Sequence, residues 1–179
     1  MLSQQLLLEL PSRAGGFSAA EFARTLTSGG ITATIGQHHD LAGGDFAAGT
    51  AEQALATARL KAGALAGAAC RLGAMVGTTD PALLDLYGRW GRHFGTVAQL
   101  ANDLHDALDT DDKSDLARGK STLPLLFKRG TAATVGMIDS GALHFTWVVV
   151  EIERQSCREI VEQLAARGQD VATLRRLIS

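Results

Sequence analysis

The stretch from residue 79 to residue 108 reads TDPALLDLYGRWGRHFGTVAQLANDLHDAL, and it decides the fold class. Proline suits the first turn of a helix because its φ is already helical and its missing N–H would have no partner there. The segment Thr79–Asp80–Pro81 therefore predicts a helix start, and apolar side chains recur beyond it at helical spacing to about Leu108. We expect one long helix over this stretch.

Other segments carry helix signals of the same kind. Ser18 with Glu21, and Thr50 with Gln53, have the spacing of a capping box, which marks a helix N-terminus. The run WVVV would favour a strand in isolation, but the sequence offers it no partner strand, and Gly168 supplies a stop for a helix. The helices expected from these signals cover residues 18 to about 41, 50–76 and 140–166, with short ones at 2–10 and 121–128.

Composition agrees with an all-α fold. Proline accounts for 3 of the 179 residues and aromatic residues for 5%, whereas Ala and Leu, which favour helices, are abundant. Apolar residues make up 46% and charged residues 20%, which is typical of a globular protein rather than a disordered one. We expect residues 1–179 to form a single helical domain.

Charge, hydropathy and cysteine content exclude several classes of protein. The 17 basic and 19 acidic residues give a net charge of −2, so there is no basic excess for nucleic acid. No run reaches the ~18 apolar residues of a membrane span, and the N-terminus lacks the features of a signal peptide. Cys70 and Cys157 lie far apart, which argues against a disulfide scaffold or a structural zinc site. We expect a cytoplasmic protein.

The most informative polar residues lie near the end of the long predicted helix. Gln99, Asn102, Asp103 and Asp106 are spaced by three or four residues, so they share one helix face. Two carboxylates one turn apart suit Mg²⁺, which prefers a few carboxylates together with the oxygens of a bound phosphate. The alternative is an acidic face that is simply solvated.

The residues that follow this helix face, from 109 to 120, are interpreted separately. The cluster Asp109–Asp112 is expected to be a solvated loop. An EF-hand is excluded because Ser114 stands where that loop requires glycine. Lys113 and Lys120 follow in the same region, where they could neutralise a bound phosphate.

Two further groups of residues precede the long helix. Gln37 and Asp40 are one turn apart and share a helix face, whereas the adjacent His38 and His39 point in different directions. We therefore interpret the histidines as surface or supporting residues rather than metal ligands. Lys61 stands in a small, apolar stretch, where a lysine often extends to the surface. The functional alternative is an ammonium that reaches into a cavity to meet an anion.

Taken together, these motifs resemble those of the trans-isoprenyl diphosphate synthases, or polyprenyl synthetases. That family carries, in order, the motifs GQ..D, K(T/S)G.L, FQ..DD..D and D..(E/D)GK.T.P. Here the same order reads GQHHD at 36–40, KAGAL at 61–65, AQLANDLHD at 98–106 and DLARGKSTLP at 115–124. Four motifs in the same order form a far more specific signal than any one of them.

The resemblance implies an isoprenoid-synthase-type helical bundle, working as a homodimer or heteromer. Such enzymes join an allylic diphosphate to isopentenyl diphosphate with Mg²⁺. Carried over by position, the implied metal ligands are Asp103, Asp106 and Asn102. The implied diphosphate ligands are Lys61, Gln99, Lys113 and Lys120. The residues implied at the reacting allyl group are Gln37 and Asp40, with Lys61 beside the leaving diphosphate.

Three departures from the family pattern affect this interpretation. The earlier DD..D motif is absent, Asn102 replaces the first aspartate of the second such motif, and Ala62 replaces a hydroxyl residue after the lysine. We therefore expect a fold truncated at its N-terminus, with weak or no turnover by the chain alone. A prenyltransferase is the leading hypothesis, and the alternative is a non-catalytic or regulatory subunit that keeps the fold for dimerisation. A plain helical binding protein is a third possibility.

Overall fold

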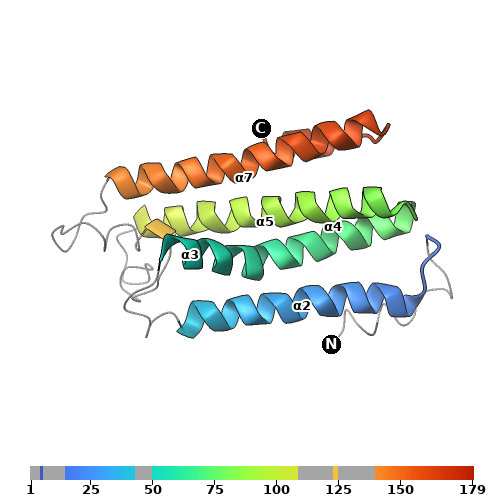
Figure 1. Cartoon of the computed structure of the whole chain (residues 1–179), viewed down its shortest axis with the longest axis horizontal. Helices are drawn as coiled ribbons and strands as arrows, with labels where there is room; N and C mark the ends of the chain where they lie inside the picture. Colours follow the sequence, from blue (N-terminus) through green and yellow to red (C-terminus); the bar gives the residue numbers. More distant parts are fainter. Residues whose placement is uncertain (1–4, 6–14, 43–49, 109–122, 125–139) are drawn as a thin grey trace.

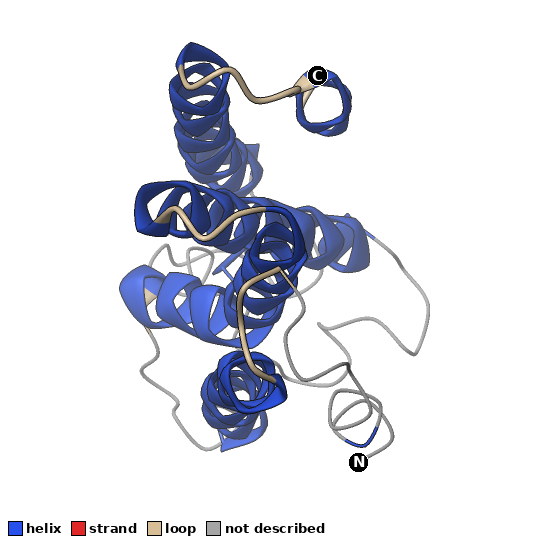
Figure 2. Ribbon diagram, turned by 90° about the vertical axis from the view of Figure 1, so that its right-hand side faces the viewer, coloured by secondary structure: helices blue, strands red, loops and turns tan. Residues whose placement is uncertain are grey.

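The computed structural model describes Gln5 and residues 15–42, 50–108, 123–124 and 140–179. Its elements are α2 (Ala19–Ala42), α3 (Ala51–Ala58), the π-helical turn η1 (Arg59–Gly63), α4 (Ala64–Gly77), α5 (Pro81–Leu108), α7 (Ser140–Ala166) and α8 (Ala172–Leu177). The described residues contain helices and no strand, which confirms the all-α prediction (Figure 2). The long helices lie side by side, with α2 and α7 at the two edges and the segment α3–η1–α4 and α5 between them (Figure 1).

The helices begin where their capping residues predict. Ser18 Oγ accepts from the Glu21 N–H at 3.4 Å, and the Glu21 carboxylate accepts from the Ser18 N–H at 2.8 Å. Thr50 and Gln53 form the same reciprocal pair at 3.2 and 2.8 Å before α3. At the start of α5, Asp80 Oδ1 accepts from the Ala82 N–H at 2.8 Å. Each pair satisfies amide groups that have no partner within the helix.

Replacing Thr50 by alanine should lower the free energy of unfolding by about 1 kcal/mol, because the first turn of α3 loses its side-chain acceptor. Urea unfolding followed by circular dichroism measures the change. The matched control is Thr34→Ala, since Thr34 lies inside α2 and donates only to the Gly30 carbonyl of its own helix. Alanine is the better helix former there, so the control should not destabilise the chain. Equal losses in the two variants would contradict the capping role.

The C-terminus of α7 is also determined by residues close to it in the sequence. Gly168 has a φ of +76°, and its N–H donates to the Ala165 carbonyl at 2.9 Å. The Gln169 N–H donates to the Leu164 carbonyl at 3.1 Å. These two bonds form a Schellman motif, in which a left-handed glycine ends the helix. Residues 147–150 lie within α7, so the prediction that this β-branched run is helical is confirmed.

The segment over residues 50–76 differs from the single α-helix that the sequence predicts. It is interrupted by η1, in which the Ala64 N–H donates to the Arg59 carbonyl five residues earlier. A Cβ on Gly63 would lie 2.9 Å from both the Arg92 carbonyl oxygen and Thr96 Oγ1. The neighbouring helix therefore reaches the backbone at this turn. Such a contact depends on residues distant in the sequence, which local helix propensity does not register.

The main core lies between α5 and α7. Trp90 stacks on Phe94 with ring centroids 4.9 Å apart, and Trp90 packs in one buried cluster with Cys157, Ile160 and Leu164. The short helix α8, which the sequence analysis did not predict, is flanked by Val171 and Ile178, and both are buried in the same cluster. On its other side α5 packs against α4 through small residues. This arrangement fixes α5 between two neighbours along its length.

Several sequence predictions fall outside the described residues. They are the helix at residues 2–10, the acidic loop Asp109–Asp112, and Lys113 and Lys120. Of the helix expected at residues 121–128, only Leu123 and Pro124 are described, and both are helical and buried. None of the described helices has the length and apolar character needed to traverse a lipid bilayer.

Candidate active site

The site is organised around the π-helical turn, which lies between α2 and α5. On one side, a Cβ on Gly36 would lie 2.5 Å from the Lys61 backbone nitrogen. On the other side, a Cβ on Gly95 would lie 2.6 Å from the Ala62 carbonyl oxygen. Only glycine allows such close approach of two backbones. The turn therefore brings the end of α2 and the second half of α5 to one place.

This close approach brings Lys61 to Asp40. The Lys61 Nζ lies 2.7 Å from Asp40 Oδ2, and the two side chains are 29% and 20% exposed. The glycine of the GQHHD motif thus positions the carboxylate that lies one helical turn further along α2. The anion that the Lys61 ammonium meets in the structure is thus a carboxylate of the chain itself. Gln37 is half-buried on the same helix.

The two histidines of the same motif are both exposed, which fits their interpretation as surface residues. In the part of the chain that the structure describes, neither histidine belongs to a group of side chains that could hold a metal ion.

The polar face of α5 consists of two side-chain pairs, each one turn long. Gln99 Nε2 donates to Asp103 Oδ1 at 2.8 Å, and Asp103 is 9% exposed. Asn102 Nδ2 donates to Asp106 Oδ2 at 3.0 Å on a more exposed track of the helix. A carboxylate oxygen has more than one lone pair, so an amide donor and a cation can share the same carboxylate. The prediction that these four residues lie together on α5 is confirmed, whereas their pairing was not foreseen.

The fit to Mg²⁺ rests on the donor types. Asp103 and Asp106 supply hard carboxylate oxygens one turn apart, and Asn102 and Gln99 can supply neutral amide oxygens. Among the described residues, no three His, Cys, Asp or Glu side chains gather into a group that could hold a metal ion. The side chains present therefore suit an ion that takes most of its remaining oxygens from water and a bound phosphate.

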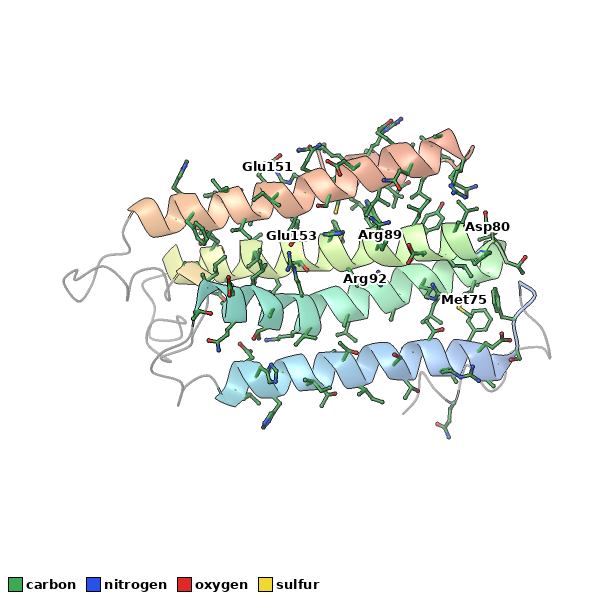
Figure 3. The ribbon with its side chains drawn as sticks, in the orientation of Figure 1. Met75, Asp80, Arg89, Arg92, Glu151 and Glu153 are labelled. Carbon is green, nitrogen blue, oxygen red and sulfur yellow. The ribbon has the colours of Figure 1, made fainter. Side chains whose placement is uncertain are left out.

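Sequence reasoning missed a buried charge cluster next to the turn. Glu153 of α7 is 2% exposed, and its two oxygens lie 2.5 Å from Arg59 Nη2 and 2.6 Å from His93 Nδ1. Figure 3 shows Glu153 pointing from α7 toward the inner helices. Arg59 is the first residue of η1, so the cluster ties α7 and α5 to the turn that carries Lys61.

The charge state of Glu153 follows from its partners. Burial alone raises the pKa of this carboxyl group, but the hydrogen bonds from His93 and Arg59 and their positive charge outweigh burial. The pKa therefore lies below its ordinary value, and Glu153 is ionised near neutral pH. A signal for it was present in the sequence, because Glu153 occupies the same helical stripe as the buried Val150, Cys157 and Ile160.

The comparisons with known proteins agree on one family. The family model described as polyprenyl synthetase matches residues 2–136. The nonaprenyl diphosphate synthase of Mycobacterium tuberculosis is 29% identical over 133 residues, which are 71% of this chain and 40% of that protein. The polyprenyl synthetase from Streptomyces coelicolor superposes with a TM-score of 0.78 at 20% identity, over 99% of this chain and 61% of that one.

A geranylgeranyl pyrophosphate synthase has the same fold, with a TM-score of 0.78 at 18% identity, over 99% of this chain and 64% of that one. The chain thus spans less than two thirds of the length of each of these proteins. The family match includes all four motifs between residues 36 and 124, and with them the lysine–aspartate pair and the polar face of α5. The chain belongs to the polyprenyl synthetase family.

Proposed function

We propose that this chain carries the catalytic residues of a prenyltransferase that condenses an allylic diphosphate with isopentenyl diphosphate. The observation that carries the proposal is the 2.7 Å pair of Lys61 and Asp40 at the same turn that α5 contacts through Gly95. Family membership supports the reaction class, because the names of related proteins describe prenyl diphosphate synthases. Following the family resemblance, we also propose a cytoplasmic protein that works as a homodimer or heteromer.

Ionisation of an allylic C–O bond leaves a carbocation and a diphosphate anion, so the site must stabilise negative charge on the departing group. Asp103 and Asp106 would hold Mg²⁺, which supplies positive charge to the diphosphate oxygens when bound. Gln99 holds one Asp103 oxygen by donating its amide N–H to it. Asn102 in place of an aspartate lowers the negative charge of this face by one.

Lys61 has three N–H donors, of which the bond to Asp40 uses one. The other two can donate to oxygens of the leaving diphosphate. Asp40 holds the ammonium in place and, with Gln37, lies at the reacting allyl group in this proposal. Lys113 and Lys120 would add further positive charge from the segment that follows α5.

The proposal predicts metal-dependent binding of diphosphate. Calorimetric titration of inorganic diphosphate should show a component that appears only with Mg²⁺ and tightens the affinity at least about tenfold, because metal and ligand share oxygens. Asp103→Asn should abolish this component. Asp85→Asn is the matched control, since Asp85 lies on the same helix, is exposed, and pairs only with Arg89. Circular dichroism checks that both variants keep the fold.

The same affinity with and without Mg²⁺, or an unchanged component in Asp103→Asn, would exclude the metal assignment. Turnover of farnesyl diphosphate plus isopentenyl diphosphate then separates the two functional classes. Mg²⁺-dependent product formation that is lost in Asp103→Asn supports the enzyme. Metal-dependent binding without product supports the non-catalytic subunit.

A further inference from the structure

A polar pocket lies between α2, α4 and α5, beyond the candidate active site. Its volume is 360 Å³, and its charged and hydroxyl lining residues are Arg24, Thr25, Ser28, Thr32, Arg71 and Arg92. Among the lining residues that the structure describes, none is acidic. Three arginines from three different helices thus face one hollow.

These arginines differ from the others in the part of the chain that the structure describes. There, Arg24, Arg71 and Arg92 have neither an ion pair nor a side-chain hydrogen bond. Six other arginines pair with carboxylates, namely Arg59, Arg89, Arg154, Arg158, Arg167 and Arg175. The remaining described arginine, Arg176, donates to Thr173 Oγ1, so only the three pocket arginines among the described ones lack a side-chain partner.

Glycines allow the side chains of Arg71 and Arg92 to lie close to the neighbouring helix backbones. A Cβ on Gly67 would lie 2.6 Å from Arg92 Cγ, so the arginine stem crosses α4 where there is no side chain. A Cβ on Gly88 would lie 3.6 Å from Arg71 Cβ and 3.7 Å from Arg92 Nη1, so both arginine side chains pass this glycine. Three like charges around one pocket repel each other, and a bound anion would offset this repulsion.

The pocket is separate from the candidate active site. Arg71 follows Lys61 by ten residues and Arg92 precedes Asp103 by eleven, which is about 15 Å along a helix axis. An anion bound between these arginines therefore does not contact the lysine–aspartate pair. Its binding can be measured independently of the proposed prenyl transfer.

We propose that this pocket binds a phosphate or diphosphate group. Guanidinium groups present paired N–H donors whose geometry matches phosphate oxygens, and hydrogen bonds between charged groups are the stronger ones. The Thr25 and Thr32 hydroxyls already donate to the carbonyls of Glu21 and Ser28, so the arginines supply the recognition. A diphosphate carries charge comparable to that of the three arginines, and the cavity is larger than a single carboxylate needs.

The test is calorimetric titration of inorganic diphosphate into the full chain with EDTA present, which removes the contribution of any metal site. Arg71→Gln and Arg92→Gln should each weaken the affinity at least about tenfold, because each removes a charged hydrogen-bond donor. Arg89→Gln is the matched control, since it removes the same charge from α5 at a residue paired with Asp85. Its affinity should stay within about twofold of the wild type.

Titration with farnesyl diphosphate under the same conditions distinguishes the source of the group. Tighter binding than inorganic diphosphate, weakened by the same two substitutions, assigns the headgroup of a prenyl diphosphate, whereas equal affinity assigns free diphosphate. Equal weakening in Arg89→Gln would overturn the proposal in favour of nonspecific charge. Loss of metal-free binding in Lys61→Met but not in Arg71→Gln or Arg92→Gln would place the anion in the candidate active site and overturn it as well.

Discussion

Replacing Gly91 by alanine should lower the free energy of unfolding by about 3 kcal/mol, because the added methyl group has no room. A Cβ at this position would lie 2.4 Å from the Ala66 carbonyl oxygen and 2.8 Å from Cys70 Sγ. The nearest atom belongs to the backbone of α4, so no rotation of a side chain relieves the contact. The helices α4 and α5 must move apart, and the packing on both sides of α5 loosens.

The matched control for this substitution is Gly73→Ala on α4. A Cβ on Gly73 meets nothing within 4 Å, and alanine is the better helix former by about 1 kcal/mol. The control should therefore stabilise the chain, so that the two glycine-to-alanine changes have opposite signs. Urea unfolding of both variants measures the difference. A Gly91→Ala variant as stable as the wild type would show that α4 and α5 are not held as closely as the structure places them.

Replacing Glu153 by glutamine should lower the free energy of unfolding by about 2 kcal/mol at pH 7, because the hydrogen bonds from His93 and Arg59 lose the carboxylate charge. Arg59 is 54% exposed, so solvent screens its share, and most of the loss comes from the His93 side of the buried carboxylate. The matched control is Glu162→Gln on the same helix, whose partner Arg175 and own side chain are both exposed. That variant should lose about 0.5 kcal/mol or less.

The difference between wild type and Glu153→Gln should also depend on pH. The native pKa of Glu153 lies below its ordinary value, whereas in the unfolded chain it returns to about 4.3. The native state therefore binds the proton less readily, and the stabilisation is complete above the unfolded pKa. It should diminish as the pH falls below about 4.3 and through the lower native pKa. A difference that stays constant from pH 7 to strongly acidic pH would contradict the charged cluster.

The fold was predictable from the sequence where its causes are local. Ser18 and Thr50 find their capping partners three residues away, and Gly168 ends α7 through bonds to residues of the same turn. The turn η1 was not predictable in this way, because Gly63 meets the backbone of α5 across about thirty residues of sequence. A close contact of that kind leaves no periodic pattern near the site.

The candidate site was predictable in part. Helical spacing placed Gln99, Asp103 and their neighbours on one face, and the structure agrees. The meeting of Lys61 with Asp40 depends on how α2 packs, so the sequence identified both residues without joining them. The ion pairs of Glu153 were not predictable, because Arg59 and His93 lie 94 and 60 residues away in the sequence. The sequence does show that this carboxylate lies on an otherwise apolar helical stripe.

The π-helical turn amounts to one residue inserted into an otherwise α-helical segment. Each residue of an α-helix rotates the chain by about 100°, so deleting one residue between Arg59 and Gly63 would turn α3 by about that angle relative to α4. The faces that these two helices present to α2 and α5 would then disagree, and Lys61 would leave the direction of Asp40. The direction of the Lys61 side chain thus depends on the number of residues in this segment as well as on their types. In an alignment of related sequences, loss of the π-helical turn would therefore be seen as a one-residue gap rather than as a substitution.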